Sequence, residues 1–291
     1  MLAPVGVPAD GTKQLVALEL CGGESADAWQ SFVDGLVARG LRAPLLCIID
    51  GNPGLRRAVT RGWPRPAVQR CCVHKLRNLQ AKAPAHARAE VTADFHRIVY
   101  AESGAEARAV YTRFERTWAK RCPGIVRSLQ EGAELLTVFD FPREQWKTLR
   151  TTNVIERLNE EFRRRVKTQG SLPGEDAALL LLYSLVATGQ ITLRKLDGHE
   201  KITAVIRARV TPAGIRRQTL VTDEPEVGVC LSFGALCQRQ HVMKMLAWDR
   251  ASLGRSDGAL QFPNEHRDLD LVQHRIACYV NEPQARGISP V

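Results

Sequence analysis

Two acidic residues, Asp50 and Glu156, lie in sequence contexts that suggest metal chemistry. Asp50 follows an apolar run at residues 45–49 and precedes a turn rich in glycine and proline, which predicts a carboxylate at the C-terminal end of a buried strand. Glu156 lies near the start of a strongly basic segment that predicts a helix. Carboxylates set among cations suit a divalent ion beside a phosphodiester, and Mg²⁺ or Mn²⁺ keeps positions open for phosphate oxygens and water. We therefore predict that both residues bind such an ion.

A Cys-x-x-His pair, Cys71 and His74, lies between these acids in the sequence. A structural zinc site would need two further ligands, and His86 and His96 have no cysteine at a familiar spacing. The alternative is a packed strand end, with His74 at the start of a helix close to Asp50. There it could orient water, contact phosphate or cap the helix.

Basic residues gather around both acids. The chain carries 41 Lys and Arg against 31 Asp and Glu, a net charge of +10, which favours a polyanionic partner such as nucleic acid over an ordinary solvated surface. Asn153 precedes Glu156 by one helical turn, so an amide and a carboxylate share one face. Phosphate contacts are expected from Arg70, Lys75, Arg77, Arg157, Arg163 and Arg164.

The bulk composition is that of a soluble globular protein. Hydrophobic residues make up 44% and charged residues 25% of the 291 positions. No secretory signal pattern is seen, and the longest apolar stretch, residues 177–187, is too short to span a bilayer. The eight scattered cysteines are expected to be reduced thiols in a cytoplasmic protein without membrane contact.

Strand and helix patterns predict an α/β fold with four segments. Residues 1–84 alternate strands and helices, beginning with a hairpin at 4–21, and predict a sheet layered by helices. Residues 85–135 predict an all-helical insertion that interrupts this sheet domain. Residues 136–205 return to it with a connector and two helices. Residues 206–291 show weak periodicity and stay unassigned, as a disordered or frameshifted tail.

Three linked motifs resemble those of the Mutator-type bacterial insertion-sequence transposases. They are Asp50-Gly-x-x-Gly-Leu55, Gln69-Arg-Cys-x-x-His-x-x-Arg-Asn78 and Thr151-Thr-Asn-x-x-Glu-Arg-x-Asn159. Their order and separations are similar to the family's, and the segment from Leu181 to Leu196 resembles the family's end. The resemblance covers residues 4 to 205.

The resemblance implies a ribonuclease H-like mixed sheet flanked by helices, and a DDE triad that holds two Mg²⁺ or Mn²⁺ ions. Asp50 matches the second acid and Glu156 the third, with Cys71, His74 and Asn153 in supporting roles. The implied reaction is metal-assisted hydrolysis of a DNA strand followed by attack of the 3′-hydroxyl on target DNA. The implied setting is a homo-oligomeric complex with terminal-repeat and target DNA at the bacterial nucleoid.

The sequence also departs from this pattern. The family's first aspartate lies on a strand before the hairpin at 4–21, and Asp10 lies in the hairpin turn, where the role is not carried over. We expect the upstream DNA-binding region of a full-length member to be missing too. We therefore predict a truncated, inactive transposase remnant that lacks the first catalytic aspartate. The alternatives are a non-catalytic DNA-binding regulator derived from a transposase, and a zinc-dependent interaction protein that uses Cys71 and His74.

Overall fold

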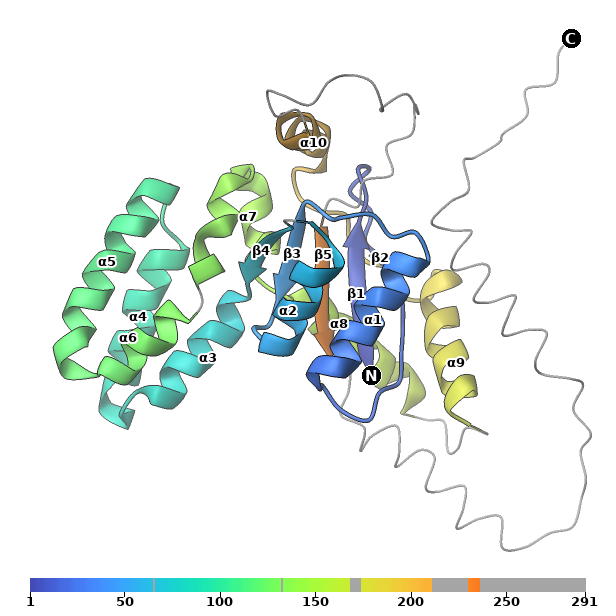
Figure 1. The fold of residues 1–291 in the computed structure, drawn as a ribbon, viewed down its shortest axis with the longest axis horizontal. Helices are drawn as coiled ribbons and strands as arrows, with labels where there is room; N and C mark the ends of the chain where they lie inside the picture. The colour runs from blue at the N-terminus through green and yellow to red at the C-terminus, as the bar shows by residue number, and fades with distance from the viewer. Residues whose placement is uncertain (65, 132, 168–173, 211–229, 236–291) are drawn as a thin grey trace, which may run out of the picture.

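A five-stranded mixed sheet forms the centre of the structure, a computed structural model that describes residues 1–64, 66–131, 133–167, 174–210 and 230–235 (Figure 1). The strand order is β2-β1-β5-β3-β4. The strands are β1 (Leu2–Val7), β2 (Gln14–Leu15), β3 (Leu46–Ile49), β4 (Ala67–Arg70) and β5 (Cys230–Ala235). β1 is antiparallel to both β2 and β5, whereas β5, β3 and β4 run parallel to one another. The predicted mixed α/β fold is confirmed.

Helices α1 (Ala26–Ala38) and α2 (Pro53–Gly62) cover one face of the sheet (Figure 1). Ser25 caps α1 by accepting a hydrogen bond from the Ala28 amide, and Asn52 caps α2. Both helices therefore begin directly after a polar N-cap residue. Their apolar sides share a core with the strands, which includes Trp29, Phe32, Cys47, Ile49, Leu55 and Phe233.

A separate helical subdomain, α3 to α6, lies to one side of the sheet (Figure 1). Its helices are α3 (Cys72–Lys82), α4 (Arg88–Val99), α5 (Gly104–Arg121) and α6 (Pro123–Gln130), with a short 3₁₀ turn at Ala85–Ala87. They enclose their own core, which includes Leu79, Phe95, Ile98, Phe114 and Trp118. Helix α3, which precedes the segment predicted as a helical insertion at 85–135, shares this core.

The chain returns to the opposite face of the sheet after the helical subdomain. Short helices at Ala133–Asp140 and Arg143–Gln145 lead into α7 (Trp146–Leu149), and α8 (Asn153–Val166) packs against β1 and β5. Ile155, Leu158 and Phe162 form the buried side of α8. The remaining helical elements are α9 (Glu175–Ala187), a 3₁₀ turn at His199–Lys201 and α10 (Ile202–Val210).

Part of the segment left unassigned at 206–291 has a defined place. Residues 206–210 belong to α10, and residues 230–235 form β5, an inner strand between β1 and β3. The other residues of this segment lie outside the described part of the chain. Within the described ranges, no helix is long and apolar enough to cross a membrane.

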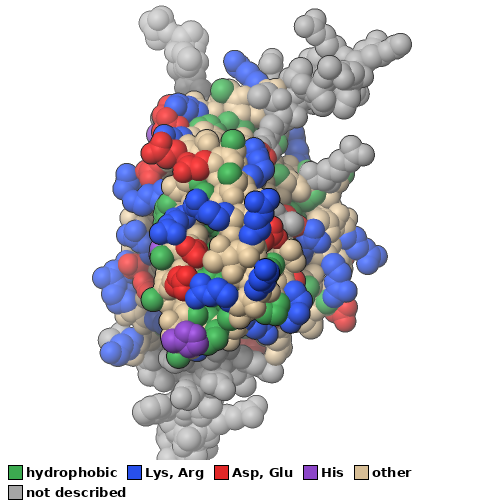
Figure 2. All heavy atoms as spheres, turned by 90° about the vertical axis from the view of Figure 1, so that its left-hand side faces the viewer, with side chains coloured by type: hydrophobic (Ala, Val, Ile, Leu, Met, Phe, Trp, Pro, Cys, Tyr) green, Lys and Arg blue, Asp and Glu red, His purple; other side chains and the backbone are tan. Residues whose placement is uncertain are grey.

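The outer face of the helical subdomain carries both signs of charge, as Figure 2 shows. Arg121 pairs with Glu90, and Arg97 pairs with Asp94. Such exposed pairs contribute little to stability. Because several cations on this face form ion pairs with acidic residues, the face is not a purely positive surface.

Phe233 provides a test of β5, because its side chain is fully buried and its ring centre lies 6.3 Å from that of Trp63. We expect Phe233→Ala to lower the free energy of unfolding by about 3–5 kcal/mol, from lost burial and a residual cavity. Urea denaturation followed by circular dichroism measures this change. Leu180→Ala, at an exposed position of α9, serves as the control and should change stability by about 0.5 kcal/mol or less. Equal effects of the two substitutions would contradict the placement of β5.

Candidate active site

Asp50 lies at the C-terminal end of β3, as predicted from the apolar run before it. Its Oδ1 accepts a hydrogen bond from the Asn52 amide at 2.9 Å, which fixes the carboxylate over the turn into α2. Gly51 has a φ of +98°, and the Arg70 guanidinium occupies the space that a β-carbon at residue 51 would need. Glycine is therefore required here both for the backbone conformation and for the close approach of Arg70.

A contact centred on the Cys71 sulfur joins the start of α3 to the start of α8. Thr152 approaches this sulfur through its amide and its hydroxyl, each at 3.4 Å. The Cys72 amide donates to the Arg150 carbonyl at 2.8 Å, and the Cys71 amide donates to the Ile49 carbonyl at 2.8 Å. The ends of β3, β4 and the 150–152 segment are thereby held together.

His74 lies between Cys71 and Glu156. Its Nδ1 is 3.2 Å from the Cys71 sulfur, and its Nε2 is 3.8 Å from Oε1 of Glu156. Arg77, one turn further along α3, approaches the same Oε1 at 3.8 Å. With Nδ1 facing the Cys71 sulfur, Nε2 of His74 faces the Glu156 carboxylate.

The titration of Cys71 and His74 reflects this arrangement. Burial raises the pKa of the Cys71 thiol, but hydrogen bonds from His74 and Thr152 outweigh burial and bring the pKa down to about 7. The hydrogen bond to Cys71 raises the pKa of His74 above its usual value; burial opposes this, and the Cys71 thiolate, Asp50 and Glu156 add to it. The contact between Cys71 and His74 thus favours the charged form of each group.

Glu156 lies 3.8 Å from the His74 imidazole, and the charge of Asp50, although distant in the sequence, also helps to raise the pKa of His74. The oxygen atoms of both acids are of the type that Mg²⁺ and Mn²⁺ accept. Within the described residues, however, no group of three or more His, Cys, Asp and Glu side chains is arranged to hold a metal. The two acids suit a divalent ion chemically, but as a ligand set they need at least one further donor.

The inner strand β5 runs parallel to β3, the strand that precedes Asp50, and their register pairs Ile48 with Ser232. Neither Ser232 nor Gly234, two residues further along β5, carries a carboxylate.

Two of the predicted phosphate contacts need correction. The Lys75 side chain is buried, with 1% of the residue exposed, and its ammonium donates to the Ser128 carbonyl of α6. Burial and the nearby Arg70 lower the pKa of Lys75 to about 8. Arg70 is buried beneath Gly51 and is attracted by Asp50. Both cations are structural, because sequence spacing does not distinguish an inward-facing cation from an exposed one.

The other predicted cations are on the surface. Arg77, Arg157, Arg163 and Arg164 are exposed, and Arg164 shares Glu161 with Arg165. Asn153 is exposed at the first position of α8, one turn before Glu156. Thr152 is the site residue that sequence reasoning missed, since its contact with Cys71 depends on how α8 docks.

Comparison with known proteins identifies the family. The family model for the Mutator-family transposases matches residues 1–191, and the chain belongs to this family. It is 34% identical to the transposase of insertion sequence element ISRM5 from Rhizobium meliloti (strain 1021), over 69% of this chain and 53% of that protein. It is 36% identical to the transposase of element IST2 from Acidithiobacillus ferrooxidans, over 78% of this chain and 77% of that protein.

A further relative is the transposase of element IS6120 from Mycolicibacterium smegmatis, 34% identical over 72% of this chain and 64% of that protein. The chain spans about half the length of several of the relatives that it matches. The predicted family resemblance is confirmed, and the relatives named here are transposases of insertion sequence elements.

The Cys71–His74 pair gives a measurable titration. We expect the thiolate absorbance at 240 nm, taken as the difference between the wild type and Cys71→Ser, to rise with a midpoint near pH 7. In His74→Ala, the loss of the hydrogen bond should move the midpoint well above 7, because burial then dominates. The buried Cys72 and Cys230 do not interfere, since burial raises the pKa of each to about 12. A wild-type midpoint at pH 9 or higher would rule out the thiolate pair.

Proposed function

We propose that this chain is a DNA transposase polypeptide whose metal-dependent site is built on Asp50 and Glu156. The observation that supports the proposal is that Glu156 lies 3.8 Å from His74, whose pKa is also raised by the charge of Asp50. Family membership supports the reaction class. The antiparallel hairpin followed by parallel strands, with helices on both faces, is consistent with a ribonuclease H-like core interrupted by the helical subdomain.

The proposed roles follow from the positions of the side chains. Asp50 and Glu156 would hold Mg²⁺ or Mn²⁺, which supplies activation of the attacking water or 3′-hydroxyl and stabilisation of the leaving oxygen. His74 orients the Glu156 carboxylate through Nε2, and Arg77 offsets its charge. Exposed Arg157, Arg163 and Arg164 position the DNA backbone without reading its sequence.

We also propose that the described residues cleave DNA strands poorly, because their site offers two carboxylates and no group of three metal ligands. The resemblance implies an acid-bearing strand before the N-terminal hairpin. β5 lies between β1 and β3, and we infer that an acid introduced at position 234 could supply the further ligand. Since misplaced catalytic groups reduce rates by orders of magnitude, two acids alone should support little chemistry.

The second candidate function is that of a non-catalytic DNA-binding regulator. It is favoured by the net charge of +10 and by the two-carboxylate site in the described residues. Both candidates imply partners in terminal-repeat and target DNA, and the family implies a homo-oligomeric complex. They differ in whether DNA strands are cut, so cleavage separates them.

Divalent-ion binding tests the two acids independently of cleavage. We expect Mn²⁺ at about ten times its dissociation constant to stabilise the wild type by about 1.4 kcal/mol, a rise of a few degrees in melting temperature. Asp50→Asn and Glu156→Gln should lose this shift. Glu160→Gln, an exposed position one turn along α8, is the matched control and should keep it. Equal shifts in all four proteins would place the ion elsewhere and refute the proposed site.

Introducing an acid on β5 tests whether a third carboxylate limits strand cleavage. With labelled terminal-repeat DNA and Mn²⁺, we expect Gly234→Asp to raise strand cleavage at least about tenfold over the wild type. Gly234→Asn has nearly the same shape without the charge and should not raise it. Denaturing gels measure the cut strand. Robust wild-type cleavage that Glu156→Gln abolishes would show instead that the chain already has a complete site.

A further inference from the structure

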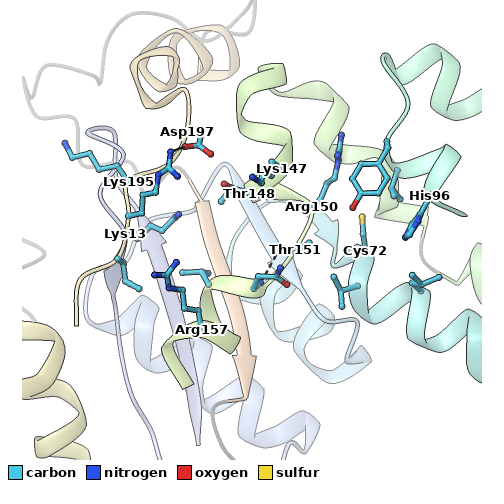
Figure 3. Close-up of a pocket in the computed structure, with 18 of the residues that line it drawn as sticks. Lys13, Cys72, His96, Lys147, Thr148, Arg150, Thr151, Arg157, Lys195 and Asp197 are labelled. Carbon is cyan, nitrogen blue, oxygen red and sulfur yellow. Dashed lines mark hydrogen bonds and ion pairs between the residues drawn. The ribbon is translucent and has the colours of Figure 1, made fainter. Parts of the chain in front are cut away.

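A groove of about 450 Å³ lies between the helical subdomain and the sheet (Figure 3). Cys72, His96 and Tyr100 line it from α3 and from α4 and its C-terminal cap. The facing wall combines α7, the start of α8, Lys13 from the N-terminal hairpin and residues 193–197. Asn153, one helical turn before Glu156 on α8, also lines the groove.

The groove is lined by many more cations than anions. Its basic side chains are Lys13, Lys147, Arg150, Arg157, Arg194 and Lys195, and its one acidic lining residue is Asp197. Asp197 already pairs with Arg194 at 3.0 Å. Within the described part of the chain, Lys147 and Arg157 have no acidic partner in an ion pair. The positive N-terminal end of α8 also lies at the groove, through Thr151 and Asn153.

The closely spaced cations repel one another, and a bound anion would reduce this repulsion. Burial lowers the pKa of Lys13, and Arg194 and Arg157 lower it further, while Asp197 opposes them. Like charges that disfavour one another in the free protein are stabilised when phosphate neutralises them. A chain of phosphates matches this wall better than a single small anion, because the cations extend along the whole groove.

Tyr100 gives the groove an exposed aromatic surface. It is the most exposed large hydrophobic side chain among the described residues, at 65%. Its ring is nevertheless held in place, since the His96 ring contacts it edge-on at 5.4 Å and the Arg150 guanidinium lies 5.0 Å from its centre. A fixed, exposed ring beside cations is the arrangement on which a nucleotide base stacks.

Resting on the proposed function, we propose that this groove binds one unpaired DNA strand, with its phosphates on Lys147 and Arg157 and one base stacked on Tyr100. In an intact duplex the base faces are covered by their neighbours, so Tyr100 could contact only a base that has left the stack. A duplex would therefore contact the cations through its phosphates but would not stack a base on the Tyr100 ring. The bound strand would continue toward Asn153 and Glu156.

The test compares strand types in EDTA, where the metal site plays no part. A fluorescein-labelled oligothymidylate of roughly ten nucleotides, within the span of known stacking platforms, and a duplex of equal length are titrated by fluorescence anisotropy. We expect Tyr100→Ala to weaken single-strand binding about tenfold and duplex binding less than twofold. Tyr100→Phe keeps the ring and should bind like the wild type.

Charge variants complete the experiment. Lys147→Ala and Arg157→Ala should each reduce the slope of log affinity against log salt by about 0.7 for the single strand. Lys120→Ala, on the exposed side of α5, is the charge-matched control and should leave the slope unchanged. Equal loss of both strand types in Tyr100→Ala, or no loss of either, would overturn the stacking proposal. Because the assay contains no metal, its failure leaves the Asp50–Glu156 proposal intact, and failure of the Mn²⁺ test leaves this one intact.

Discussion

The docking of Thr152 on the Cys71 sulfur is the constraint on which the candidate site depends. The two residues are 81 positions apart, and the whole helical subdomain lies between them. Their contact sets where α8 begins relative to β4, and hence where Glu156 lies relative to Asp50. It also sets the direction of His74, because the same sulfur engages Nδ1 of that ring. One buried sulfur atom therefore links the His74 imidazole, which lies next to Glu156, to the start of α8.

Two cations of this chain are buried instead of exposed. Lys75 reaches from α3 to the end of α6 within the helical subdomain, and Arg70 fills the space under Gly51 at the edge of the sheet. Burying a cation is costly unless carbonyls or carboxylates compensate it, and here the Ser128 carbonyl and the Asp50 carboxylate do so. These two residues stabilise the fold, whereas the cations that we propose to contact DNA line the groove or lie along α8.

Much of the fold could be predicted from local patterns. The N-terminal hairpin, the helices capped by Ser25 and Asn52, and the strand that ends at Asp50 all follow from caps, turns and apolar runs. The inner strand β5 could not be predicted, because its short apolar run stands among residues without clear periodicity. Such a strand forms mainly because its backbone hydrogen-bonds to β1 and β3, and less because of the propensity of its own residues. The same limit applies to Lys75, whose burial depends on a carbonyl 53 positions away.

Short local motifs are enough to identify the two acids, the Cys-x-x-His pair and the family to which the chain belongs. Which of these groups meet, and which cations face water, depends on the tertiary structure. The reason is physical. Motif spacing fixes chemistry and local geometry, whereas convergence depends on packing and hydrogen bonds between segments that are distant in the chain.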